Sequence, residues 1–291
     1  MQVSETQSPE KKGFLSFRIE NSFQYVPPAF ITLILLIGQF SFGILDSYEN
    51  IVASILTSVI AEIVLARFIL GTWKNLSSAY ISGISVGILI RSNLLWPYII
   101  TALLSIMSKY VLRYKGKHLW NPSNFGVSWM LFMAPLSVAG LSIQWGNNML
   151  PLAVIWALGL IIVNRAKRLH VTVTYVVSFV VLAYVRSLLT GDTFLSELSP
   201  LTGPMYQLFI FFMITDPPTS VSTRRGRILV AFLVAFVEFV LRLNSFIYAP
   251  FYALFLVGPL SRFIDLKSKR NADKSNPVLE PVADISVDTV K

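Results

Sequence analysis

The feature of this sequence that most restricts its fold is a succession of long apolar runs separated by short polar segments. Of the 291 residues, 54% are hydrophobic and 13% are charged, and a soluble domain with so few charges could not bury that much apolar surface. A bilayer core about 30 Å thick requires about 20 apolar residues per helix. The sequence therefore predicts an all-α integral membrane protein with about ten transmembrane helices.

The predicted spans divide the chain into three parts. A cytoplasmic N-terminal segment, 1–27, contains a candidate interfacial helix at 14–26, because apolar and polar residues alternate there. The ten-helix domain covers 28–266, and a polar tail, 267–291, is expected to be disordered. The predicted spans are about 28–45, 51–70, 76–90, 94–112, 125–142, 149–163, 171–190, 200–215, 228–243 and 246–261.

The basic residues predict how these spans are oriented. With the N-terminus inside, 21 of the 24 lysines and arginines fall in inside loops or tails, and only Arg91, Arg186 and Arg242 fall outside. Cytoplasmic loops are enriched in Lys and Arg, so we expect a multi-pass protein with both termini cytoplasmic. The same distribution explains the net charge of +9 without nucleic acid as a partner.

Composition also excludes several kinds of chemistry. There is no cysteine, so the chain itself supplies no disulfide, thiolate nucleophile or iron–sulfur ligand. The two histidines, His118 and His170, lie in basic loops, so no metal site is expected. The first residues are polar and lack the apolar core of a cleavable signal peptide.

A faint repeat relates the third and eighth spans, which are both short. The third begins at Leu76 with LSSAYISGISVGILIRS, and the eighth begins at Leu201 with LTGPMYQLFIFFMITDP. The two spans are five helices apart, so they run in opposite directions through the membrane. Inverted repeats with short helices at matching positions indicate a binding site near the bilayer midplane. We therefore expect two inverted five-helix repeats.

Three stretches resemble one family of membrane proteins. FFMITDPPTSVSTRRGR, from Phe211, is similar to the pattern F-F-x-x-T-D-P-x-T-x-x-x-T-x-x-G-(R/K) of the NqrB subunit of the sodium-translocating NADH:quinone oxidoreductase and the RnfD subunit of the Rnf electron-transport complex. KHLWNPSNFG at 117–126 and VGPLSRFID at 257–265 resemble two further segments of this NqrB/RnfD family. The resemblance runs from about 28 to 266 and implies two inverted five-helix repeats in a bacterial inner (cytoplasmic) membrane.

The resemblance also has a clear departure. Redox members of the family carry FMN esterified to the threonine of an S-G-A-T-like motif after the fifth helix. The corresponding stretch here, LSVAGLSIQWGNNMLPL, contains no threonine and offers only Ser137 and Ser142. We therefore expect no covalent FMN, and the chain resembles a short branch of the family that lacks the FMN threonine.

Asp216 is the most informative candidate site residue. Pro217 and Pro218 follow it, so the simple interpretation is a helix stop. An acid at a helix C-terminus opposes the macrodipole, and one of the arginines at 224, 225 and 227 could compensate it by folding back. Thr215 and Thr219 add hydroxyl groups that could bind backbone or ligand. A structural clamp and a ligand contact are equally compatible with these residues.

Other polar or small residues complete the predicted site. Asn121 and Asn124 flank Pro122 before the fifth span, where Asn124 or Ser123 is the expected helix cap. The alternative is an amide pair that, with the helix N-terminus, holds a polar ring or an anion. Gly83 and Gly87 form a G-x-x-x-G pattern, which indicates either close helix packing or a groove for a flat ring. The candidate cofactor-binding residues are Asn121, Asn124, Thr215, Asp216, Thr219, Gly83 and Gly87.

Two acids lie inside apolar spans, where an ionisable group usually faces a partner or a pathway. Glu62 precedes Arg67 by five residues, and Glu238 precedes Arg242 by four. Local pairing within one helix is therefore the simplest expectation for both acids.

Three functions from different classes fit these features. The first is an electron-transport subunit of an Rnf-like complex that binds a flavin (riboflavin or FMN) or a quinone-like ring noncovalently. The second is a transporter or channel for a small polar solute. The third is a membrane scaffold for a partner enzyme, without a ligand. Whether the chain is an enzyme stays open.

Overall fold

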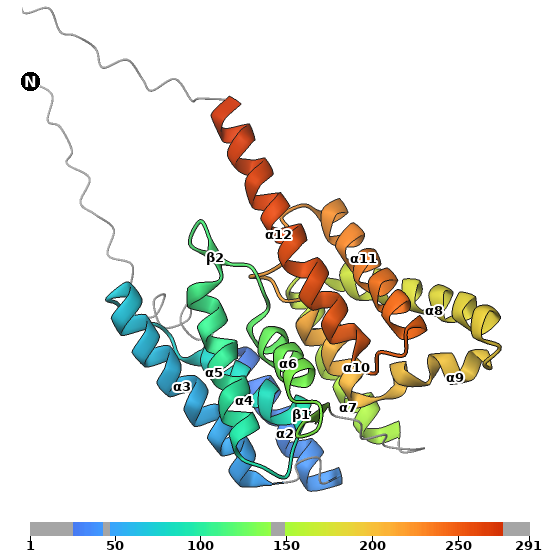
Figure 1. The fold of residues 1–291 in the computed structure, drawn as a ribbon, viewed down its shortest axis with the longest axis horizontal. Coiled ribbons are helices and arrows are strands. Elements are labelled where there is room, and N and C mark those ends of the chain that lie inside the picture. The colour runs from blue at the N-terminus through green and yellow to red at the C-terminus, as the bar shows by residue number, and fades with distance from the viewer. Residues whose placement is uncertain (1–25, 43–46, 141–148, 276–291) are drawn as a thin grey trace, which may run out of the picture.

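The computed structural model describes residues 26–42, 47–140 and 149–275, and helix dominates all three ranges (Figure 1). The helices are α2 (Val26–Phe42), α3 (Tyr48–Leu70), α4 (Ser77–Leu89), α5 (Trp96–Val111), α6 (Pro122–Met133), α7 (Met149–Arg165), α8 (Leu169–Thr190), α9 (Phe194–Leu198), α10 (Pro204–Leu208), α11 (Arg224–Leu243) and α12 (Ala249–Ser275). A 3-10 turn, η2 (Ser199–Thr202), precedes α10, and a π-helix, η3 (Phe209–Met213), follows it.

Four strands of two residues each accompany the helices. β1 (Ile90–Arg91) pairs antiparallel with β4 (Ala139–Gly140), and β2 (Arg113–Tyr114) pairs with β3 (Lys117–His118). Non-helical backbone within an apolar bundle must satisfy its hydrogen bonds inside the protein. The β1–β4 pair does so where α4 ends.

The mostly helical membrane architecture agrees with the sequence. Three helices are long and apolar enough to cross a bilayer, at Tyr48–Leu70, Leu169–Thr190 and Ala249–Lys269. Shorter apolar helices cover Ser77–Leu89, Ala153–Arg165 and Pro204–Met213. Each of the ten predicted apolar runs contains helix, and the number of bilayer crossings remains a prediction.

Two predicted boundaries are wrong. The sequence predicts that α6 continues to about residue 142, but it ends at Met133. Pro135 explains this end, because the residue before a proline is disfavoured in the α region. At the other end of the chain, α12 extends to Ser275, so the first part of the tail that we expected to be disordered is helical. A helix anchored by packing propagates through residues such as Lys and Arg at little cost.

The short helices lie in the interior of the bundle. In α4, side chains from Ala79 to Leu89 are mostly buried, and in η3 Phe209, Ile210, Phe211 and Met213 are buried. A helix too short to span the hydrocarbon core is therefore shielded from lipid by its neighbours.

The two halves of the chain pack in a similar order. In the first half α3 packs on α4 and α5, and α5 packs on α6. In the second half α8 packs on α11, and α11 packs on α12 (Figure 1). The halves meet where α6 packs on α12 and α2 on α7.

Two predicted features fall mainly outside the described residues. The candidate interfacial helix at 14–26 shares only Val26, the first residue of α2, with the described ranges. The tail after Ser275 also lies outside them.

Candidate functional site

The chain changes direction at Asp216 through a π-helix. The Ile214 N–H donates to the Phe209 carbonyl at 3.1 Å, five residues earlier, which is the π-helical spacing. Single π turns often occur at functional sites. Thr215 is buried, and its hydroxyl donates back to the Phe211 carbonyl at 2.6 Å. This hydroxyl therefore stabilises the end of the helix.

Asp216 organises the non-helical segment that follows. The Thr219 hydroxyl donates to its carboxylate at 2.8 Å, and the Ser220 hydroxyl donates to its backbone carbonyl at 2.7 Å. Pro217 and Pro218 are exposed, so the loop they begin lies at the protein surface. The two prolines and these local bonds replace the helical hydrogen bonds that end here.

Asn121 reaches the same carboxylate from the other half of the chain. Its side-chain oxygen accepts the Asn124 N–H at 3.0 Å and caps α6, and its side chain also interacts with the Asp216 carboxylate and favours the ionised form. The expectation that Asn124 or Ser123 is the cap was therefore wrong. Pro122 is the first residue of α6, where its missing N–H is harmless, and this leaves Asn121 in the extended capping position.

Burial raises the pKa of Asp216 to about 6, from an ordinary value of 3.8. The hydrogen bonds from Thr219 and Asn121 and the charge of Lys109 act in the opposite direction, but they do not offset the loss of water. Asp216 lies just after the eighth predicted span.

The predicted arginine clamp on Asp216 does not form. Thr223 caps α11 by accepting the Gly226 N–H at 3.1 Å, which places Arg224 and Arg225 on an exposed helix start. Arg227 donates to the Thr223 and Ser222 carbonyls. The arginine that supports this loop comes from α12, where Arg262 donates to the Ser220 carbonyl at 2.6 Å.

Asn124 faces α12 and not Asp216. Its side chain is 1% exposed, and its amide donates to the Phe251 carbonyl at 3.1 Å. The Ser128 hydroxyl donates to the same carbonyl at 3.2 Å, and the Asn124 side-chain oxygen is buried without a partner. The two predicted amides therefore serve different neighbours.

A cavity of about 30 Å³ lies beside Asn121 and Thr219. α11 contributes Arg227 to its wall, and α12 contributes Gly258 and Pro259. A water molecule needs about 10–15 Å³ of such space, so the cavity admits about two waters. A flavin or quinone ring requires the loop after Asp216 to move.

Gly83 and Gly87 are packing positions. A Cβ added to Gly83 would lie 2.6 Å from Ile55 Cα, and one added to Gly87 would lie 2.7 Å from a side-chain atom of Ile51. The Ser54 hydroxyl also donates to the Gly83 carbonyl at 2.9 Å. α3 therefore fills the face where the sequence allowed a groove.

Local pairing of the two intramembrane acids was a wrong prediction. Glu62 bonds across to α5, where Lys109 Nζ lies at 2.7 Å and the Tyr110 hydroxyl at 2.8 Å. Glu238 accepts the Tyr206 hydroxyl at 2.6 Å and also that of Tyr175. Sequence spacing identifies neighbours on one helix but not neighbours on packed helices, which is why these partners were missed.

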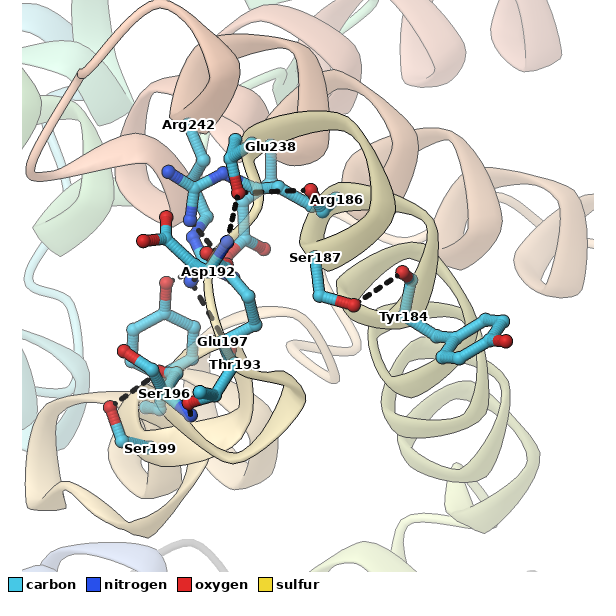
Figure 2. A network of polar contacts seen from close by, with 12 residues as sticks. Tyr184, Arg186, Ser187, Asp192, Thr193, Ser196, Glu197, Ser199, Glu238 and Arg242 are labelled. Atoms are coloured by element: carbon cyan, nitrogen blue, oxygen red, sulfur yellow. Dashed lines mark hydrogen bonds and ion pairs between the residues drawn. The ribbon is translucent and has the colours of Figure 1, made fainter.

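A third buried acid, Glu197 in α9, was not predicted from the sequence. Arg186 of α8 and Arg242 of α11 both pair with its carboxylate, the latter at 3.0 Å (Figure 2). These are two of the three basic residues predicted on the outer side. Because basic residues are rare on the outer side, Arg186 and Arg242 were the sequence signal that an acidic partner lies nearby.

Comparisons with known proteins agree with the family indicated by the sequence motifs. The model of the NQR2, RnfD, RnfE family matches residues 138–272. The D subunit of the ion-translocating oxidoreductase complex of Cronobacter sakazakii (strain ATCC BAA-894) is 34% identical over 107 residues. This alignment spans 36% of the chain and 29% of the relative. These matches confirm the predicted resemblance to this family, and the family model covers mainly the second half of the chain.

Proposed function

We propose that the chain is a membrane electron-transport subunit that binds a flavin or a quinone-like ring noncovalently beside Asp216. The observation that supports this proposal is the contact between Asn121 and Asp216, which joins two motifs 95 positions apart (216 − 121) in the sequence. Asn121 supplies an amide and Thr219 a hydroxyl, and both group types bind the polar edge of a ring. The match to the family model and the name of the relative support an electron-transport assembly.

The loop from Asp216 to Thr223 forms one wall of the cavity, and it must move if the cavity is to admit a ring. It has no regular helix, it starts with two exposed prolines, and it borders the water-sized cavity. Its opening would expose the α6 N-terminus, whose first N–H groups and helix dipole favour an electron-rich carbonyl. The ring would enter between α6 and α12.

Purified protein and added flavin test this proposal. We expect riboflavin or FMN fluorescence to be quenched by the wild type, and Asp216→Asn or Asn121→Ala to weaken this binding. Asp192→Asn is the matched control, because Asp192 is an exposed acid on the α8–α9 loop. Equal binding by all four proteins contradicts a site at this corner. A quinone analogue tests the second ring class by competition.

The missing FMN threonine leads to a separate expectation. We infer that no flavin is attached through a phosphodiester, so the intact mass equals the 32.6 kDa of the chain. Ser137 and Ser142 are the candidate positions in the loop after α6, and Ser142 lies outside the described residues. An added mass equal to that of FMN would place a covalent site in the chain.

We also infer two inverted five-helix repeats with both termini cytoplasmic. The similar packing order of the two halves supports this arrangement. Reporter fusions after Asp46 and Asn147 should report the outside, and fusions after Lys117 and Arg227 the inside. One clear reversal contradicts the inverted repeat. The other subunits of an Rnf-like complex are the proposed membrane partners.

The size of the cavity favours a second candidate function. A space for about two waters suits a small polar solute or ion better than a ring. Reconstituted liposomes test this transporter hypothesis, because solute flux without flavin binding would support it over the first proposal.

A further inference from the structure

Among the three buried glutamates of the described residues, Glu62 and Glu238 have partners that differ in charge. Glu62 is 3% exposed and faces the ammonium group of Lys109 at 2.7 Å. Glu238 is 0% exposed, and its hydrogen-bond partners are the neutral phenols of Tyr175 and Tyr206. Burying an ionised carboxylate is costly unless a cation compensates it, and Glu62 has such a cation in Lys109 whereas the hydrogen-bond partners of Glu238 are neutral.

The nearest cation to Glu238 is already engaged. Arg242 lies one turn further along α11, and its guanidinium donates to the Glu197 carboxylate at 3.0 Å and to the Glu197 carbonyl at 3.2 Å. Arg186 also pairs with Glu197 (Figure 2). The two arginines and Glu197 sum to +1, and an ionised Glu238 makes the group neutral. Taking up one proton at Glu238 restores +1.

A small cavity connects Glu238 with these arginines. It measures about 10 Å³, enough for one water, and Glu238, Arg186 and Arg242 line it together with Ala183 and Ala235. The Nε of Arg186 is buried without a hydrogen-bond partner. A water in this cavity would therefore lie beside both the arginine side chains and the Glu238 carboxyl group.

The cluster also reaches the surface of the protein. The side chain of Arg186 is 20% exposed and that of Arg242 is 13% exposed, while Glu197 is enclosed between them. Arg186 and Arg242 therefore have solvent-facing atoms and also border the cavity that holds Glu238.

We propose that Glu238 is a proton-exchanging carboxyl group that is reached by water through the cavity beside Arg186 and Arg242. A hydronium ion that enters from solvent gives its proton to a Glu238 oxygen and remains as water, so the cluster gains one positive charge; in the reverse step Glu238 returns the proton to the water, which carries it out as hydronium. Tyr175 and Tyr206 keep their own protons and donate hydrogen bonds in both states. The site is separate from the Asp216 corner and does not depend on ligand binding there.

Infrared difference spectroscopy of the purified full-length protein tests the exchange. We expect the wild type to gain a protonated-carboxyl band as the pH is lowered and this band to shift in D2O. Glu238→Gln should lose the band, whereas Glu62→Gln should keep it. A wild type without such a band, or a band that persists in Glu238→Gln, overturns the proposal.

A second variant keeps the test decisive if Glu238→Gln does not fold. Tyr206→Phe removes one of the two phenol donors, so it should shift the frequency of the same band. An unshifted band in folded Tyr206→Phe shows that the protonated group is not Glu238.

The route for water is tested by filling the cavity. Ala183→Val places two methyl groups where the water is expected and should slow H/D exchange of the band several-fold. Ala231→Val is the matched control, because Ala231 is an equally buried alanine that lines the other cavity, beside Thr219. Equal exchange rates in the two variants overturn the proposed route.

Discussion

The ammonium group of Lys109 lies 2.7 Å from the Glu62 carboxylate and joins α5 to α3 inside an apolar bundle. Both side chains are less than 10% exposed, and Tyr110 donates a further hydrogen bond to the same carboxylate. Removing one partner of a buried ion pair leaves an uncompensated charge, so it destabilises a protein more than replacing both partners with apolar residues does.

Lys109→Met should therefore destabilise the protein by about 3–5 kcal/mol, because Glu62 loses its cation. The double variant Lys109→Met with Glu62→Met should recover most of this loss. Denaturant unfolding in detergent measures both. Lys74→Met is the control, because Lys74 is exposed and only approaches the Tyr110 ring at 5.3 Å. An equal loss in the single and double variants would show that packing, and not charge, accounts for the effect.

A second prediction concerns Trp120 and Pro259. Pro259 lies inside α12 and has no N–H, so it cannot bond to the Phe255 carbonyl four residues earlier. The Trp120 indole donates to that carbonyl at 3.0 Å. Trp120→Phe should therefore cost about 1 kcal/mol of stability. In a Pro259→Ala background, where the helix satisfies the carbonyl itself, the same change should cost less, and a double-mutant cycle measures this coupling.

The positions of the helices could be predicted because the signal is local. Each apolar run of the sequence contains helix in the structure, and Pro135 is an equally local signal for the end of α6. The partners of Glu62 and Glu238 could not be predicted, because the residues that contact them lie on other helices. The contact of Asn121 with Asp216 could be predicted only because both residues belong to motifs that carry the family resemblance.

A third prediction separates the two interpretations of the glycine pattern in α4. Gly83→Ala should destabilise the protein by about 1–3 kcal/mol, because the added methyl group would lie 2.6 Å from backbone of α3. Gly258→Ala in α12 is the matched control. Its Cβ would meet Leu254 at 3.5 Å, an ordinary contact, and alanine favours helix by about 1 kcal/mol. If Gly83→Ala leaves the thermal stability unchanged, α3 does not pack closely on Gly83, and the result would favour the interpretation of this face as a groove for a flat ring.

The last prediction uses the pKa of Asp216, which burial raises from 3.8 to about 6. Between these values the folded protein binds more protons at this group than the unfolded chain does, so the stability should fall as the pH rises. The contribution of Asp216 is most favourable below about pH 4 and is lost by the time the pH exceeds about 6. Thermal unfolding should show this decline in the wild type, and Asp216→Asn should remove the part of it that Asp216 contributes. Asp192→Asn, on the exposed α8–α9 loop, should leave the decline in place. The opposite slope, with the wild type gaining on Asp216→Asn as the pH rises, would show that ionised Asp216 has a cationic partner, as the arginine clamp requires.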